Sequence, residues 1–249
     1  NHLHPFMNDI LQTEKLTKRF SSVLAVDSLS FALRQGSITA LLGGNGAGKT
    51  TTLSMLLGLL EPTSGKISLF GQDFIRNRYN VLGRMNFSSP YVDLPQRLTV
   101  RENLTVYARL YGVVNVRERI ETVSSEFRLQ DLLDRRVRRL SSGQKTRVSL
   151  AKSLINRPEF LLLDEPTASL DPDTTVWIRD FLKNYRDTYK ATILFASHDM
   201  REVQLLCDEV LLMKRGKIVE EGSPQELLLK HGKDDLEQVF LDVSREEEA

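Results

Sequence analysis

The chain of 249 residues carries 34 basic and 33 acidic residues, giving a formal net charge of +1, and 41% of its residues are hydrophobic. This length can bury a substantial core, and the balanced charge disfavours nucleic acid as a partner because there is no cationic surplus to neutralise phosphates. The apolar stretches are shorter than the roughly 18–20 residues that span a bilayer, so we expect any membrane crossing to belong to another chain.

The single cysteine and the amino terminus bear on where the protein works. Cys207 has no second cysteine with which to form an internal disulfide, and no secretory signal is recognised, which favours a reducing cytoplasm. Residues 1–6 show no periodic pattern, so we expect residues 1–8 to be a leader left by cloning or a disordered segment. His2 and His4 are therefore poor candidates for metal ligands.

The amino-terminal part of the chain is predicted to contain strands and one helix. Residues 10–33 alternate in polarity and are rich in Val, Leu and Phe, which indicates two strands joined by a turn near residues 21–22. An apolar strand at residues 38–42 precedes a glycine-rich loop, and helical spacing then covers residues 51–60. A Pro-Thr-Ser-Gly stop leads into a strand at residues 66–70. The order is therefore strand, glycine loop, helix, strand.

The middle of the chain is predicted to be helical. Thr99 and Glu102 form a capping-box pattern, in which the hydroxyl and the carboxylate each accept a hydrogen bond from a backbone amide at the start of a helix. This pattern opens a region at residues 99–157 that is helical throughout in its spacing. We therefore expect a helical subdomain at about residues 88–157, inserted into the rest of the fold.

The carboxyl-terminal part returns to apolar strands separated by helices. Asp171 followed by proline is typical of a helix start, and the pattern after Gly222 is helical, giving a tail at residues 223–249. Strands are predicted at residues 160–163, 192–196 and 210–213. Strands that alternate with helices imply an α/β fold with a mainly parallel sheet covered on both faces, preceded here by an antiparallel β region.

A glycine-rich loop between a strand and a helix is the strongest chemical signal. It matches the pattern Gly, four residues, Gly-Lys-Thr of phosphate-binding loops, with Gly43, Gly44, Asn45, Gly46, Ala47, Gly48, Lys49 and Thr50. Glycines let successive amides point inward, and the helix that starts near Gly48 adds its dipole, which suits a polyphosphate. Lys49 is expected to meet the β and γ phosphates, and the Thr50 hydroxyl to bind magnesium. The alternative, a glycine-rich turn with a surface lysine, is disfavoured by the flanking strand and helix.

Two acids follow the strand predicted at residues 160–163. Because carboxyl ends of parallel strands meet at the ligand-binding edge of an α/β sheet, Asp164 suits the magnesium shell and Glu165 suits polarisation of an attacking water. His198 ends the next apolar strand and could donate a hydrogen bond to a γ phosphate. A hydrolase triad of Ser197, His198 and Asp199 is disfavoured, because neighbours in sequence cannot converge as that chemistry requires.

Five motifs together resemble those of the ATP-binding subunits of ABC transporters. They are a Walker A loop at residues 43–50, the signature Leu-Ser-Ser-Gly-Gln at 140–144, a Walker B motif at 161–167, a D-loop at 169–172 and a switch histidine, His198. The motifs occur in that family's order and at its spacings over about residues 10–222. The resemblance implies a P-loop NTPase (RecA-like) core, with an ATPase domain at residues 9–222.

The resemblance implies an ATPase that binds ATP and Mg²⁺ and drives a separate transmembrane permease. Such subunits form head-to-tail homodimers or heterodimers, in which each ATP lies between the Walker A loop of one chain and the signature of the other. The signature residues open a helix predicted at residues 144–155, a position where anions bind and where ordinary helix capping also occurs: Ser141, Ser142, Gly143 and Gln144. The expected location is the cytoplasmic face of the cell membrane, reached only through the permease.

The resemblance also assigns roles to individual residues. Glu165 would be the catalytic base, while Lys49, Ser141 and His198 would stabilise charge on the transferring phosphoryl group. Thr50 and Asp164 would hold the metal. The further nucleotide contacts that it implies are Phe20 stacked on adenine, Val26 lining the same pocket, Thr51 beside the phosphates and Asp171 across the dimer.

Three positions depart from the family pattern. Gly44 stands where the family has proline, and Ser142 stands where it has glycine. The glutamine that the family places before the helical subdomain is missing between residues 84 and 91, and Gln96 comes too late to replace it. Ser88 or Ser89 is expected to occupy the position of the missing glutamine. Altered coupling between nucleotide and permease is therefore expected.

Other functions fit these motifs less well. ABC proteins acting on ribosomes or DNA carry two cassettes or a long coiled-coil insert, and a P-loop kinase or GTPase would leave the signature unexplained. The segment at residues 222–241 resembles the tail of subunits from exporters of drugs, polysaccharides and lipids, which favours export over import. The arginine-dense residues 134–139 suit either a solvated helix end or a contact with a partner. The transported substrate is set by the permease and has no signal in this sequence.

Overall fold

Two β-sheets form the body of the molecule. The computed structural model describes residues 9–89 and 93–245. Within them one antiparallel sheet has the order β2-β1-β4-β5, built from β1 (Asp9–Phe20), β2 (Val23–Arg34), β4 (Ser64–Leu69) and β5 (Gln72–Asp73). The turn predicted near residues 21–22 joins β1 to β2, as expected. The expected leader at residues 1–8 lies outside the described residues.

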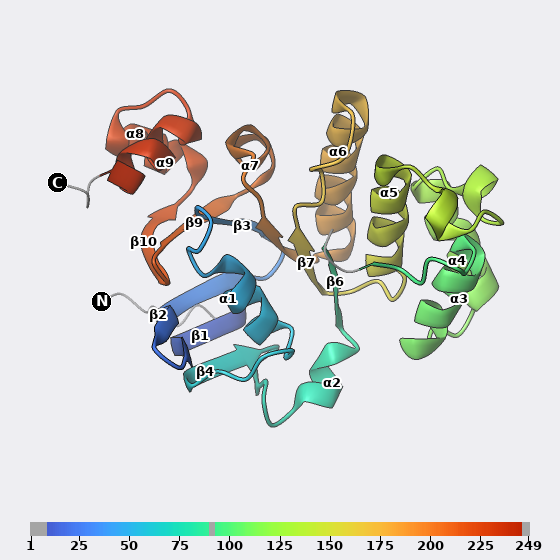
Figure 1. Cartoon of the computed structure of the whole chain (residues 1–249), viewed down its shortest axis with the longest axis horizontal. Helices are drawn as coiled ribbons and strands as arrows, with labels where there is room; N and C mark the ends of the chain where they lie inside the picture. The colour runs from blue at the N-terminus through green and yellow to red at the C-terminus, as the bar shows by residue number, and fades with distance from the viewer. Residues whose placement is uncertain (1–8, 90–92, 246–249) are drawn as a thin grey trace.

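The second sheet has six strands and carries the site (Figure 1). Its order is β10-β9-β3-β8-β7-β6, with β3 (Ile38–Leu42), β6 (Met85–Ser88), β7 (Phe160–Asp164), β8 (Thr192–Ala196), β9 (Glu209–Lys214) and β10 (Lys217–Gly222). Every pairing is parallel except that of β10 with β9. The predicted α/β class with a mainly parallel sheet is therefore confirmed.

The short strands β5, β6 and β10 were not predicted. β6 has the sequence Met-Asn-Phe-Ser, and its polar residues interrupt the kind of apolar run from which β3, β7 and β8 were predicted. β10 is an edge strand that alternates exposed with half-buried residues, so it shows no apolar run either. In both strands the ladder with a neighbour supplies the extended conformation, which local composition does not reveal.

Helix α1 (Lys49–Leu56) packs between the two sheets. Its residues Leu53 and Leu56 share a buried cluster with Leu11 of the antiparallel sheet and Leu41 of the six-stranded sheet. The helix predicted at residues 51–60 was misplaced at both ends, because α1 starts two residues earlier and stops four residues earlier. Gly58 adopts a left-handed conformation with φ of 68°, which ends the helix.

Four helices cover the opposite face of the six-stranded sheet: α6 (Pro172–Tyr189), α7 (Met200–Leu206), α8 (Pro224–His231) and α9 (Leu236–Arg245). Buried residues of this face, such as Ile193, pack with Leu182 of α6, Val203 of α7 and Val239 of α9. The predicted N-cap Asp171 accepts from the Thr174 amide at 3.0 Å at the start of α6. Across the described part of the chain, every helix is too short or too polar to cross a bilayer.

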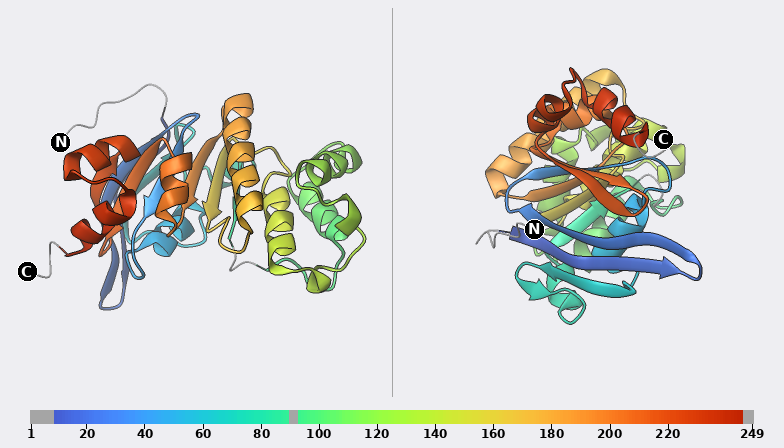
Figure 2. Two further views of the ribbon diagram at one scale, coloured as in Figure 1. Left: turned by 90° about the horizontal axis from the view of Figure 1, so that it is seen from above. Right: turned by 90° about the vertical axis from the view of Figure 1, so that its left-hand side faces the viewer.

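A mainly helical segment lies between β6 and β7. Its elements are α3 (Val100–Leu110), α4 (Val116–Glu126), α5 (Ser142–Ser153) and two 3₁₀ turns, η1 (Gln130–Leu132) and η2 (Val137–Arg139). The predicted capping box is present, since Thr99 Oγ1 accepts from the Glu102 amide at 3.1 Å. A β-bridge between Thr99 and Arg136 shows that the segment is not helical throughout. Figure 2 shows it projecting from the sheets, away from α8 and α9. Another short helix, α2 (Arg78–Leu82), precedes β6.

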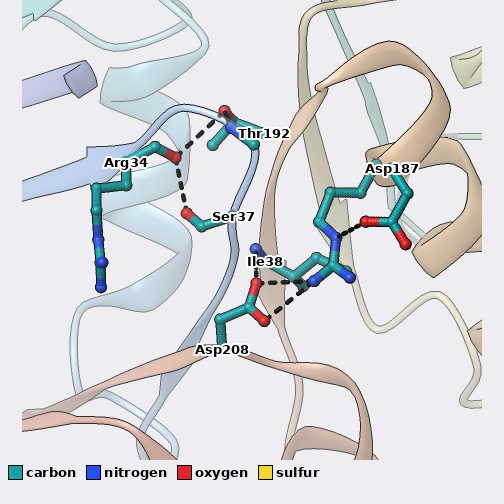
Figure 3. Close-up of polar contacts among 8 residues, drawn as sticks. Arg34, Ser37, Ile38, Asp187, Thr192 and Asp208 are labelled. Carbon is teal, nitrogen blue, oxygen red and sulfur yellow. Dashed lines mark hydrogen bonds and ion pairs between the residues drawn. The ribbon is translucent and has the colours of Figure 1, made fainter. Parts of the chain in front are cut away.

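A polar network ties together the amino-terminal ends of the central strands (Figure 3). Asp208 Oδ2 accepts from the Ile38 amide at 2.8 Å and from Arg186 Nη1 at 3.0 Å. Thr192 Oγ1 donates to the carbonyl of Arg34, the last residue of β2 in the antiparallel sheet, at 3.4 Å. Because Ile38 begins β3 and Thr192 begins β8, this network fixes the end of the sheet opposite the glycine loop.

One buried cation joins α5 to the sheet. Lys152 is 5% exposed, and its Nζ donates to the Phe87 carbonyl of β6 at 2.7 Å. The same Nζ lies 4.6 Å from the Phe87 ring centroid and 5.4 Å from that of Tyr107 on α3. Burial lowers the pKa of Lys152 to about 8. The lysine therefore changes charge within an accessible pH range at the junction of three elements.

Replacing Lys152 by methionine is expected to change how stability depends on pH. Because the folded pKa lies below the ordinary value of 10.5, the unfolded chain binds more protons between pH 8 and 10.5, so stability rises with pH there. Between pH 7.5 and 9.5 the wild type should gain about 2 kcal/mol of unfolding free energy relative to Lys152→Met. Urea denaturation at both pH values measures this difference. Lys66→Met, at an exposed position, serves as the control, and equal pH slopes for wild type and Lys152→Met would contradict the prediction.

Candidate functional site

The glycine loop connects the carboxyl end of β3 to the first residue of α1. Gly43 and Gly48 have φ of 155° and 104°, a region that favours glycine. A Cβ added to Gly43 would lie 2.5 Å from the Met213 carbonyl oxygen, and one added to Gly48 would lie 2.6 Å from the Ala25 carbonyl oxygen. Both positions therefore require glycine, because of their backbone conformation and because a side chain has no room. Gly48 is the N-cap of α1, so the amino-terminal end of this helix faces the loop.

Lys49 folds back over this loop. Its Nζ donates to the carbonyl oxygens of Gly43 and Gly44, the latter at 3.2 Å. Burial lowers the pKa of Lys49, and the charges of Glu165 and Asp164 act against that shift. The ammonium is therefore placed between the loop and two carboxylates, where it can exchange carbonyl partners for phosphate oxygens. Thr50, the next residue, is exposed at the start of α1.

The two acids predicted to follow β7 stand at the same edge of the sheet. Asp164 Oδ2 accepts from Ser89 Oγ at 3.0 Å, and burial raises the pKa of Asp164. Glu165, which has φ of 48°, brings Oε1 to 2.7 Å from His198 Nδ1, and its Oε2 accepts from Ser197 Oγ at 3.4 Å. The structure thus brings Glu165 and His198 into direct contact, although they lie 33 residues apart.

The two serines left at the position of the missing glutamine have different partners. Ser88 Oγ lies 2.9 Å from Ser149 Oγ of α5, so it faces the helical segment. Ser89 Oγ donates to Asp164, so it faces the predicted metal site. Ser89 is therefore the serine that can influence a metal, while residues 90–92 lie outside the described residues.

The signature residues form the start of α5. Ser141 is the N-cap, with its Oγ accepting from the Gln144 amide at 3.3 Å and its own amide donating to Gln144 Oε1 at 3.0 Å. α5 begins at Ser142, two residues before the predicted start, because the capping box fixes the first turn. The exposed Ser142 side chain meets no crowding, whereas a Cβ on Gly143 would lie 3.3 Å from the Ser169 carbonyl oxygen. The departure at residue 142 is therefore sterically harmless in a single chain.

The predicted adenine contacts divide into one exposed and one buried residue. Phe20 ends β1 with 45% of its surface exposed, and Lys18 Nζ lies 5.2 Å from its ring centroid. Val26 has no exposed surface, because the alternation along β2 turns its side chain into the core under α1. The role of Val26 beside a nucleotide stays a prediction. Its neighbour Ala25, which sequence reasoning did not select, contacts the glycine loop through its carbonyl.

The residues present fit the magnesium that the motifs imply. Mg²⁺ is usually held by one or two carboxylates, waters and substrate phosphates, so a dedicated cage of acids is not needed. Among the described residues no group of three or more His, Cys, Asp or Glu side chains could hold a metal. Asp164 supplies the carboxylate, and Thr50 supplies an exposed hydroxyl.

Comparison with known proteins places these motifs in one family. The family model described as "ABC transporter" matches residues 26–168. A Nod factor export ATP-binding protein I from Ralstonia nicotianae is 37% identical over 235 residues, covering 94% of this chain and 73% of the relative. The ABC transporter ATP-binding protein NatA from Bacillus subtilis is 37% identical over 88% of this chain and 90% of the relative. The bacitracin transport ATP-binding protein BcrA from Bacillus licheniformis is 38% identical over 86% of this chain and 70% of the relative.

Solved structures agree on the fold. The structure of cbiO1 from Clostridium perfringens, part of the ABC transporter complex cbiONQ, has a TM-score of 0.77 at 30% identity and covers 90% of this chain. It is matched over 92% of its own length. An ATP-binding subunit of an ABC transporter has a TM-score of 0.87 at 24% identity, covering 94% of this chain and 99% of that one, which shows the fold alone. The chain therefore belongs to the ABC transporter family, as one of its ATP-binding subunits, which are ATPases that power transport.

Proposed function

We propose that Glu165 is the catalytic base of ATP hydrolysis in this subunit. The observation that carries the proposal is the cluster of Glu165, Lys49, Asp164 and His198 at the carboxyl edge of the parallel sheet. The amides after Gly43 and the Lys49 ammonium bind the phosphates, and Glu165 accepts the proton of the attacking water. His198, held against Glu165 at 2.7 Å, can reorient toward the γ phosphate.

Magnesium completes the site in this proposal. Thr50 and Asp164 would hold Mg²⁺, which supplies charge neutralisation between the β and γ phosphates. Ser89 orients the Asp164 carboxylate through its 3.0 Å hydrogen bond. Phe20 remains exposed at the end of β1, where it can stack on a base, and Thr51 lies beside the phosphate loop.

Replacing Ser89 by alanine is expected to raise the Mg²⁺ concentration for half-maximal ATPase activity by about three- to tenfold. The reason is that Asp164 loses the hydroxyl donor that holds its carboxylate in place. Titrating ATPase activity with MgCl₂ at fixed ATP measures the shift. Ser88→Ala is the matched control, because Ser88 contacts Ser149 and not Asp164. An equal shift in both variants would show that the effect is structural and would contradict this role for Ser89.

A complete ATP site requires a second subunit in this proposal. The amides at the start of α5, with Ser141, Ser142, Gly143 and Gln144, would meet the ATP bound to the Walker A loop of the other subunit, and Asp171 would reach across the same interface. Either a homodimer or a heterodimer satisfies this geometry. The corresponding division of the chain is an ATPase domain at residues 9–222, a helical subdomain inserted at about residues 88–157 and a tail at residues 223–249.

The membrane partner would bind the helical segment. ABC relatives of this chain work with transmembrane permease subunits. Large apolar side chains are exposed here, with Leu110 73% and Val114 93% exposed beside a hollow of about 350 Å³. That hollow is bordered by Tyr111, Val113 and the buried Arg119. Exposed apolar surface next to a hollow suits a protein partner, which would hold the subunit at the inner face of the membrane.

Export is the direction that the relatives favour. The names of the relatives above include Nod factor export and bacitracin transport, and these substrates belong to those proteins.

Steady-state hydrolysis of MgATP by the purified chain tests the enzymatic part. If the subunits associate weakly into dimers, the rate is expected to rise faster than linearly with protein concentration. ATP-driven transport in vesicles holding the chain and its permease tests direction. Full hydrolysis at concentrations where sedimentation finds only monomer would overturn the dimer, and absence of hydrolysis with the permease present would overturn the ATPase assignment.

A further inference from the structure

Helix α9 is fastened to the strand that supports the glycine loop. Leu236 and Val239 of α9 are each 2% exposed and belong to the larger buried cluster. Lys214, the last residue of β9, donates from Nζ to the Val243 carbonyl at 2.8 Å. The preceding residue, Met213, is the one whose carbonyl oxygen contacts Gly43. The carboxyl-terminal helix and the glycine loop therefore share β9 as a support.

Phe240 of α9 extends from this support toward the glycine loop. It borders a hollow of about 160 Å³ with Gly44, Asn45, Gly46 and Ala47 on the other side. A Cβ added to Gly44 would lie 3.9 Å from Phe240 Cζ, which is ordinary van der Waals contact. Phe240 therefore lies just beyond Gly44, close enough that a methyl group at position 44 would reach it.

The same side chain also borders the region of the switch histidine. A second groove, of about 630 Å³, lies between α7 and α9, and its lining includes His198, Met200 and Phe240. Phe240 is half-buried and packs on the larger core cluster, which fixes its position between the two openings. One residue of the carboxyl-terminal helix therefore lies between the loop proposed to bind phosphate and the loop that carries His198.

We propose that Phe240 is a positioning residue for the glycine loop, so that helix α9 sets the affinity of the subunit for ATP; this inference rests on the proposed function. Three of the first four residues of the loop are glycine, and ordering such a backbone around a phosphate costs conformational entropy. The ring across the small hollow from Gly44, and the Met213 carbonyl of β9 close to Gly43, limit how far the loop can move before ATP arrives. Restriction of a free binding loop improves affinity more than it changes the chemical step.

Two variants test this role in the full chain. Phe240→Ala removes the ring, and Phe240→Leu keeps apolar packing while withdrawing the Cζ atom that faces Gly44. We expect the dissociation constant and KM for MgATP to rise by about three- to tenfold in Phe240→Ala and by about two- to threefold in Phe240→Leu, with kcat within about twofold. Leu229→Ala is the control, because Leu229 lies in the same tail and is 83% exposed.

A rescue experiment separates positioning from general destabilisation. In Phe240→Ala the hollow beside the loop enlarges, and a methyl group added by Gly44→Ala would fill part of it, so the double variant should recover part of the lost affinity. Thermal denaturation shows whether each variant is folded. If Phe240→Ala does not fold, the KM of Phe240→Leu alone tests the inference. A folded Phe240→Leu with unchanged KM, or with reduced kcat and unchanged KM, overturns the inference. Failure of the wild type to bind or hydrolyse MgATP would instead overturn the proposed function.

Discussion

Replacing Glu165 by glutamine is expected to lower the rate of ATP hydrolysis by about a hundredfold or more while leaving ATP affinity within about threefold of the wild type. Glutamine has nearly the shape of glutamate and can still form a hydrogen bond with His198, now at 2.7 Å from Glu165 Oε1. It cannot accept the proton of the attacking water. The change therefore removes the base and preserves the binding site.

Phosphate release and calorimetry with MgATP measure the two quantities separately. The matched control is Glu121→Gln on α4, because Glu121 is exposed and pairs only with the exposed Arg117 at 3.1 Å among the contacts found in the described residues. Loss of hydrolysis should also leave ATP-bound dimers to accumulate, which sedimentation would detect. Wild-type turnover in Glu165→Gln would eliminate Glu165 as the base and direct attention to His198.

The second large effect is expected for Lys49→Ala. Removing the ammonium should weaken ATP binding by about ten- to hundredfold, since a hydrogen bond to a charged group contributes about 1.5–3 kcal/mol. AMP binding should change little, because Lys49 is proposed to meet the β and γ phosphates, which AMP lacks. The comparison of ATP with AMP thus distinguishes loss of a phosphate contact from a collapsed loop.

Calorimetric titration of both nucleotides into Lys49→Ala gives this comparison directly. Lys66→Ala removes an exposed lysine of β4 and serves as the charge-matched control. Equal losses for ATP and AMP would mean that Lys49 supports the loop through Gly43 and Gly44, which its Nζ contacts in the structure. That outcome would contradict direct phosphate binding by Lys49.

Much of the local structure follows from short-range chemistry. The capping box at Thr99 and the N-cap at Asp171 were predicted from neighbouring residues, and both are present. The strands β3, β7 and β8 follow from apolar runs, because strands of a parallel sheet are buried on both faces. Prediction was weaker where local signals were weak, as at the end of α1 and in the edge strand β10.

The sequence by itself determined the fold class, the glycine loop between strand and helix, and the order of the family's motifs, because these depend on composition and spacing over a few residues. Only the tertiary structure decided that Ser89 rather than Ser88 contacts Asp164, that Val26 is buried, and that Glu165 contacts His198. It also placed Phe240 against the loop that opens with Gly43. Each of these outcomes depends on the register of strands and the direction of side chains that are distant in sequence, and packing of the whole chain sets both.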